Sequence, residues 1–298
     1  FPYHINEGLF EARARISGLL FKFQPNWRPV YDATAVVNFR NERMHITATD
    51  GLLGLIDVQR ADVVIPNLTE ELNARLEITA QIAGNANELK PLFDDSPLAD
   101  SLGATLADVQ LSGPVTGYLD LLIPLTDEPD VVAQGYADLA DAEIYVRSIK
   151  ENFTNVHGRI NYRNDVITAP ALTMQWHGFP IQAELATRQR EHDYFADLQL
   201  HGDWQLTEFA PVLAGSMPWQ ADFNLSIPTQ GGYSFRWHQS AKLDDVSIHL
   251  PEPLGKSVGA EQQLELTVSG DPDSILVNAE VADTVLLELQ FNGDLSEL

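Results

Sequence analysis

The sequence predicts an all-β fold with two short helices, in which tandem repeats build an elongated, curled, mostly antiparallel sheet around a taco-like groove. Three observations predict it. Apolar and polar residues alternate over many short stretches, polar turn clusters separate these stretches, and a pattern of residues returns further along the chain. With 298 residues and 44% apolar content, the chain is long enough to bury a core and too apolar for disorder.

Alternation marks the strands from the N-terminus onward. In residues 10–16 the phenylalanine, alanine and isoleucine side chains fall on one face, and a glutamate and two arginines fall on the other. The same period of two appears in the stretches 76–82, 198–200, 264–268 and 285–291. It is typical of antiparallel strands with one apolar and one solvated face. Polar clusters between these stretches, such as 40–43 and 163–165, indicate turns.

A repeat is visible when the sequence is compared with itself. Residues 37–42 (Val-Asn-Phe-Arg-Asn-Glu) match residues 160–165 (Ile-Asn-Tyr-Arg-Asn-Asp). Two later matches, of 119–124 with 223–228 and of 137–146 with 241–250, share one spacing of 104 residues (119 to 223 and 137 to 241). Repeats of this length grow along one axis and present a continuous surface, so we expect the function to reside in that surface.

Two segments break the alternation and predict short helices. One lies near 86–102, where Leu89, Leu92 and Phe93 have helical spacing, and the other lies near 207–214, where Thr207 can cap a turn. Each follows a strand that ends in glycine, so we expect the helix to belong to the repeat.

The repeat predicts four segments in one continuous array. Residues 1–29 end a preceding repeat, residues 30–150 form a first unit, residues 153–253 form a second unit, and residues 260–298 begin a third. The chain opens at Phe1 without a methionine, so we expect a mature or excised piece of a longer protein.

The apolar strand faces pose a packing problem, because two short helices cannot cover about twenty strands. The faces must meet one another, as in a sandwich, or line a groove that holds a guest, because a bare apolar groove would aggregate. We expect the apolar member of each alternation to line the groove. This lining set consists of Phe10, Ala14, Ile16, Val37, Phe39, Ile78, Ile82, Leu119, Leu121, Ile123, Ile160, Tyr162, Leu198, Leu200, Phe223, Leu225, Leu266 and Leu289.

Charge and composition disfavour several classes of function. The net charge of −25, with scattered acidic residues, disfavours nucleic acid and anionic membrane surfaces as partners, because both need clustered Lys or Arg. There is no cysteine, and the eight histidines lack metal-ligand spacing. No nucleotide-binding loop, nucleophile elbow or local glycosidase motif occurs. We therefore expect no metal, no cofactor and no catalytic residue.

Three segments of the N-terminal third carry a family resemblance. They are residues 8–12 (Gly-Leu-Phe-Glu-Ala), residues 21–27 (Phe-Lys-Phe-Gln-Pro-Asn-Trp), and the strand at 37–39 with its hairpin to 44–46. Together with the segments 96–98 and 122–125, they resemble the central region of the large AsmA-like proteins of Gram-negative bacteria, in particular the YhdP family.

The resemblance implies a fold, a location and a function. YhdP-like proteins are anchored in the inner membrane by an N-terminal helix and cross the periplasm as a long curled β-sheet. By this resemblance, the apolar groove carries phospholipid acyl chains between the inner and outer membranes, the neighbouring repeats of the parent chain are its protein partners, and no catalytic residue is carried over. The chain would then be a segment of a periplasmic lipid conduit.

A second interpretation, from another class of protein, stays open at this stage. It is a carbohydrate- or protein-binding β-sandwich array, in which the tryptophans at 27, 176, 204, 219 and 237 stack on sugars. Phospholipid that co-purifies with the protein would favour the conduit, and glycan binding without lipid would favour the sandwich.

Overall fold

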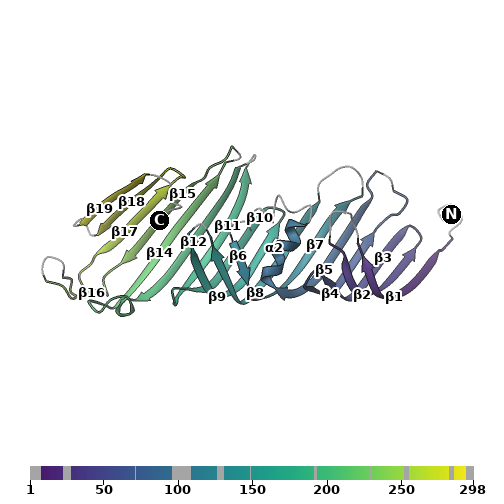
Figure 1. The fold of residues 1–298 in the computed structure, drawn as a ribbon, viewed down its shortest axis with the longest axis horizontal. Coiled ribbons are helices and arrows are strands. Elements are labelled where there is room, and N and C mark those ends of the chain that lie inside the picture. The colour runs from purple at the N-terminus through teal and green to yellow at the C-terminus, as the bar shows by residue number, and fades with distance from the viewer. Residues whose placement is uncertain are drawn as a thin grey trace. The chain divides into compact units, whose positions relative to one another are not determined.

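The structure is a computed structural model that describes residues 8–22, 28–70, 72–95, 109–125, 131–147, 149–190, 193–228, 230–251, 255–281 and 285–292. Most of these residues lie in β-strands (Figure 1). The packing divides the chain into two compact units, Phe1–Asp165 and Val166–Leu298. Each unit is described by itself below.

The first unit is an open antiparallel sheet. Its strands are β1 (Glu11–Phe21), β2 (Val30–Arg40), β3 (Arg43–Leu53), β4 (Ile56–Ile65), β5 (Arg75–Asn85), β6 (Val109–Ser112), β7 (Pro114–Pro124), β8 (Val132–Val146) and β9 (Glu151–Arg163). Consecutive strands pair, except that β5 pairs with β7 and that β6 pairs with the end of β8. Strands β6 and β7 therefore form one line along β8, interrupted at Gly113.

The second unit is also built on a large antiparallel sheet. Its large sheet contains β10 (Val166–Trp176), β11 (Phe179–Arg190), β12 (Asp193–Gln205), β14 (Ser216–Ile227), β15 (Ser234–Lys242), β17 (Gln263–Gly270), β18 (Ser274–Val281) and β19 (Val285–Asn292). All the pairings within this sheet are antiparallel. A small second sheet pairs β13 (Leu213–Ala214) with β16 (Ser247–Ile248).

The strands of both units confirm the predicted all-β, antiparallel fold. Over the described residues, each unit has one large sheet, whereas a β-sandwich needs two large sheets packed face to face. The repeat boundaries expected at 30–150 and 153–253, and the continuity of the array, stay predictions.

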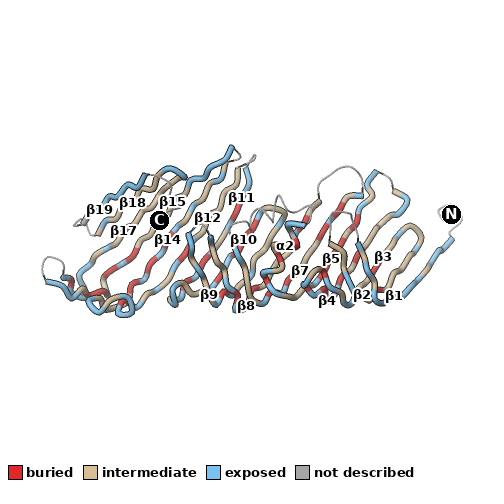
Figure 2. The backbone as a smooth tube through the Cα atoms, in the orientation of Figure 1, coloured by how far each residue is buried: buried red, intermediate tan, exposed pale blue. Residues whose placement is uncertain are grey.

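Alternation along the strands decides which face of the sheet is buried. In β4, for example, Ile56 and Val58 are buried, whereas Asp57 between them is exposed. Figure 2 shows this change of burial class along the strands. In the first unit, a core cluster joins β3, β4 and β5 to the short helix α2 (Leu89–Asp94). Its members are Leu53, Val58, Ala61, Ala80 and Leu92.

The two copies of the Arg-Asn turn have the same structure. Asn41 and Asn164 adopt positive φ angles of 52° and 51°, which asparagine tolerates better than most residues. The backbone N–H of each donates to the carbonyl of Phe10 or Ala133, at 2.9 and 2.7 Å. The side-chain oxygen of Asn41 accepts a hydrogen bond from the backbone N–H of Phe10, and that of Asn164 accepts one from the backbone N–H of Ala133, each at 2.9 Å. The repeated asparagine therefore ties its hairpin to a third stretch of chain.

The helix predicted near 86–102 is present in its described part, whereas the one near 207–214 is not an α-helix. The first consists of the 3₁₀ helix η1 (Ala86–Glu88) and of α2 (Leu89–Asp94), and residues 96–108 lie outside the described residues. The second is only the 3₁₀ helix η3 (Leu206–Glu208). Proline does not account for the difference, because α2 contains Pro91 just as the second segment contains Pro211.

Gly113 and Gly215 show that the repeat extends to backbone geometry. Their φ angles are 95° and 105°, and a Cβ on either would lie within 3 Å of the backbone of Ala142 or Asp245. The carbonyl of each glycine accepts a hydrogen bond from the first residue of η1 or η3, at 2.8 and 3.0 Å. Each unit therefore needs a glycine where the chain leaves its helical segment and rejoins the sheet.

Candidate functional site

Each unit presents one apolar face, and the strand register shows how it is built. Directly paired residues of an antiparallel sheet lie on the same face. In the first unit, one row of such pairs runs from β1 to β8 through Ala14, Val37, Ile46, Val63, Ile78, Leu121 and Ala133. The next row runs from β1 to β9 through Ile16, Ala35, Ala48, Ala61, Ala80, Leu119, Gly135 and Tyr162.

The register brings the first-unit members of the lining set together on this face. They belong to these rows or to the adjoining ones, and they are Ala14, Ile16, Val37, Phe39, Ile78, Ile82, Leu119, Leu121, Ile123, Ile160 and Tyr162. Phe10 lies two residues before Ala12, which pairs with Phe39, so the alternation extends the same face to it.

The second unit has a corresponding apolar face. One row runs from β11 to β19 through Leu185, Leu198, Phe223, Trp237, Val268, Val277 and Leu289. The adjoining rows contain the remaining members of the lining set, Leu200, Leu225 and Leu266. The register therefore places the members of the lining set on one face in each unit. That this face contacts lipid stays a prediction.

Burial changes across the apolar face of the first unit. Ile123 and Leu121 in β7 are 0% and 1% exposed, whereas Ile16 in β1 is 36% exposed and Phe10 before it is 39% exposed. In the second unit, Leu289 at the last strand is 41% exposed. The first unit's face is therefore closely packed near β7 and open to solvent at β1, and the second unit's face is open to solvent at β19.

An aromatic cap covers one end of the second unit's face. It consists of Phe179, Trp204, Phe209 and Trp219. Phe209, just after η3, stacks on Phe179 with ring centroids 4.3 Å apart and 7° between the ring planes. Trp204 lies 4.8 Å from Trp219 and 5.4 Å from Phe209. Trp219 is only 4% exposed, so it is packed core and not a platform for sugars, whereas Phe209 is 47% exposed.

Polar side chains interrupt the apolar face in both units, and Tyr162 in the first and Gln239 in the second are two of them. The Tyr162 hydroxyl donates to the backbone carbonyl of Tyr118 at 3.3 Å, and burial, helped by the charge of Asp120, raises the pKa of Tyr162. In β15, Gln239 lies between Ala221 and Leu266. Sequence reasoning missed Gln239, although the period of two in β15 places it on the apolar face.

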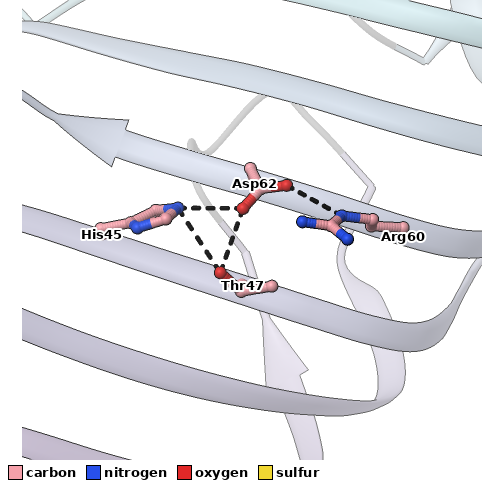
Figure 3. A network of polar contacts seen from close by, with 4 residues as sticks. All are labelled: His45, Thr47, Arg60 and Asp62. Carbon is pink, nitrogen blue, oxygen red and sulfur yellow. Dashed lines mark hydrogen bonds and ion pairs between the residues drawn. The ribbon is translucent and has the colours of Figure 1, made fainter.

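The opposite face of the first unit is polar and contains the network in Figure 3. His45 Nε2 lies 2.9 Å from Asp62 Oδ1, and the Thr47 hydroxyl donates to the same oxygen at 3.0 Å. Arg60 donates to the other carboxylate oxygen at 3.2 Å. Burial would raise the pKa of the Asp62 carboxyl, but these hydrogen bonds outweigh it and hold the pKa below its ordinary value.

This network joins β3 to β4 and does not have the geometry of a catalytic triad. A triad uses the two ring nitrogens of histidine separately, one toward the nucleophile and one toward the carboxylate. Here Nε2 of His45 is the ring atom near both Thr47 and Asp62. The network therefore fixes the pairing of two strands.

A second ion pair ties β8 to β9 on the same polar face. Arg159 donates to both carboxylate oxygens of Asp138, at 2.7 and 2.8 Å, and its guanidinium lies 3.7 Å from the centre of the Tyr136 ring. The bidentate hydrogen bond with Arg159 lowers the pKa of Asp138. Polar cross-strand contacts of this kind hold the strand register from the solvent side.

Two shallow hollows lie away from the centres of the apolar faces. One, of about 400 Å³, lies beside η1 and α2 and is lined by both Lys90 and Glu143. The other, of about 510 Å³, lies at the ends of β15, β17, β18 and β19. Among the described residues, no three His, Asp or Glu side chains come together as metal ligands, and no helix is long and apolar enough to span a membrane.

Comparison with known proteins identifies the family of the chain. The family model described as YhdP protein matches residues 1–297. The chain is 31% identical over 282 residues to the intermembrane phospholipid transporter YhdP of Escherichia coli strain K12. The match covers 92% of the chain and 22% of that relative's length. No solved structure matches the chain. The chain belongs to the YhdP family.

Proposed function

We propose that the chain is a segment of a lipid conduit, in which the apolar face carries phospholipid acyl chains between the inner and outer membranes. The observation that carries the proposal is the division of each sheet into one apolar face, partly open to solvent, and one face of polar cross-strand pairs. The relative that is named an intermembrane phospholipid transporter supports the lipid as cargo.

The physical argument concerns the exposed part of the apolar face. Leu287, Leu289 and Phe291 are 45%, 41% and 42% exposed, and all three lie on the same side of β19. Apolar area costs about 25 cal/mol for each Å² left in water, so a bare row of such residues favours contact with an apolar partner. An acyl chain satisfies it, and the headgroup stays hydrated outside the sheet.

The lining set, the location and the partners belong to the same proposal. The accessible members of the lining set contact acyl chains, whereas buried members such as Leu121 and Ile123 pack in the core. The segment works in the periplasm, and neighbouring repeats of the parent chain continue the face. An inner-membrane anchor elsewhere in the parent chain fixes the conduit at one end. The segment carries lipid without changing a covalent bond, so it needs no catalytic residue and no cofactor.

Lipid extraction tests the proposal. The purified chain is extracted into organic solvent, and mass spectrometry measures phospholipid per protein in the wild type, in Leu225→Asp and in Ser226→Asp. Leu225 is on the apolar face and Ser226 on the polar face of the same strand. We expect phospholipid in the wild type and in Ser226→Asp, and a strong loss in Leu225→Asp, because an acyl chain cannot pass without desolvating the carboxylate.

The parent protein gives the second readout. Lipid transport in cells should fail with Leu225→Asp and survive with Ser226→Asp. Wild-type protein free of lipid, or full transport by a stably expressed Leu225→Asp protein, would show that the face is not a conduit.

A further inference from the structure

One amide side chain lies in the middle of the apolar face of the second unit. Gln239 pairs with Ala221 on β14 and with Leu266 on β17, and its row continues through Leu200 and Ala279. All its neighbours in the row are apolar. Its side chain is half-buried, so it remains within reach of a molecule that lies on the face.

The indole of Trp237 fixes the orientation of this amide. Trp237 is two residues earlier on β15 and faces the same side, and its Nε1–H donates to Gln239 Oε1 at 3.3 Å. Because an indole nitrogen only donates, the amide must turn its oxygen toward Trp237. The amide nitrogen of Gln239 then points its two N–H donors away from that bond, and no residue of the described ranges accepts from it.

The face around Gln239 is rich in donors and poor in acceptors. The ring nitrogens of Trp204 and Trp219 lie on the same face and are also donors without a hydrogen-bond partner among the described residues. They are fully buried in the aromatic cap, whereas the Gln239 amide is within reach of a ligand. A ligand that fits this face therefore has an apolar body and an acceptor that cannot donate. An acyl ester has this chemistry, because its carbonyl oxygen only accepts and lies at the end of a hydrocarbon chain.

We propose that the Gln239 amide nitrogen donates a hydrogen bond to an acyl ester carbonyl of the carried lipid, so that the second unit prefers ester-linked lipids. The proposal rests on the conduit function and specifies its substrate class. We expect this preference in the second unit and not in the first. At the spacing of 104 residues, the equivalent of Gln239 is Gly135 (135 to 239). The polar group beside Gly135 is the Tyr162 hydroxyl, which already donates to a backbone carbonyl.

A competition between two matched lipids tests the proposal. The purified chain is incubated with an equimolar mixture of a diacyl phosphatidylethanolamine and its dialkyl ether analogue, which has the same chain lengths and headgroup but no carbonyl. Native mass spectrometry then measures the amount of each lipid bound. We expect the wild type to prefer the ester by about five-fold, the factor that one neutral hydrogen bond of typical net strength gives.

Variants in β15 and in the neighbouring β14 test whether the Gln239 amide causes the ester preference. Gln239→Leu should bind both lipids equally, and Trp237→Phe, which frees the amide to turn, should lower the ester preference. The matched control is Gln220→Leu, on the polar face of β14, which should keep the wild-type ratio. Circular dichroism checks that all three variants fold.

Each outcome decides between the two proposals. Equal binding of both lipids by the wild type, or an unchanged ratio in Gln239→Leu, overturns the ester site and leaves the conduit standing. Absence of both lipids from the wild type overturns the conduit and the ester site together.

Discussion

Leu121 and Leu225 occupy equivalent positions in the two repeats but differ in burial, so the same substitution should have different effects. The spacing is 104 residues (121 to 225). Leu121 is 1% exposed, between Ile78 and Ala133, whereas Leu225 is half-buried. We expect Leu121→Asp to destabilise the first unit strongly, and Leu225→Asp to leave the second unit folded.

The magnitude follows from two costs. Removing the Leu121 side chain from the core costs about 2–3 kcal/mol. An aspartate in that place must be neutral to stay buried, and protonating it at pH 7 from an ordinary pKa near 3.9 costs about 4 kcal/mol. The total of about 6–7 kcal/mol is of the order of the whole stability of a domain. At Leu225 the carboxylate stays hydrated, so only part of the first cost applies, about 1–2 kcal/mol.

Hydrogen exchange resolved by peptide is the assay, because it reports the strands of each unit separately. Leu121→Asp should speed exchange in β5, β7 and β8, and Leu225→Asp should leave exchange in β12, β14 and β15 within a few-fold of wild type. Equal acceleration around both sites would refute the reasoning, because it would mean that the second unit's face is as closely packed as that of the first.

Gly215→Ala should destabilise the second unit by about 2–4 kcal/mol in urea unfolding, because a Cβ there meets the carbonyl of Asp245. Gly231→Ala, also at positive φ but with open space around it, should cost about 1 kcal/mol, and equal costs would contradict the clash. Lys256→Met should cost about 1–3 kcal/mol, because the buried ammonium donates to backbone carbonyls that would lose it, and an unchanged urea midpoint would contradict this. The pKa of Asp62 is below its ordinary value of 3.8, so its ionised form stabilises the fold above that pH and the contribution is lost as the pH falls further. Asp62→Asn should therefore flatten the fall of stability with acid in urea titrations between pH 5 and pH 2, and a wild-type slope would show that the network contributes nothing.

Local pattern predicted the parts of the fold that depend on local chemistry. The alternation placed residues such as Val37 and Phe223 on the correct face, because the side-chain period of a strand does not depend on its partners. The repeated asparagine predicted two turns, and Asn41 and Asn164 form them with the same hydrogen bonds. The predicted helix near 207–214 is only the 3₁₀ helix η3, and proline is not the reason, because Pro211 has a counterpart, Pro91, inside α2.

The degree of burial could not be predicted from the sequence. Leu121 and Leu225 have similar local sequences, and only the side chains packed over them distinguish a closed core from an open face. Gln239 shows the opposite case, because its position was readable from the period of two in β15. It was missed because the pattern was sought in apolar residues only.

The asparagine turns bear on which substitutions the chain can accept. A sheet usually relies on the packing of its buried face to prevent its strands from slipping by one residue. Here Asn41 and Asn164 fix neighbouring strands from the turns, and pairs such as Asp138 with Arg159 fix them from the solvent side. The strand register therefore does not depend on the packing of the apolar face alone. One hydrocarbon side chain on this face can replace another with little loss of stability. Variation among close homologues should accordingly concentrate on the apolar face as swaps of Leu, Ile, Val and Phe, while the turn asparagines stay fixed.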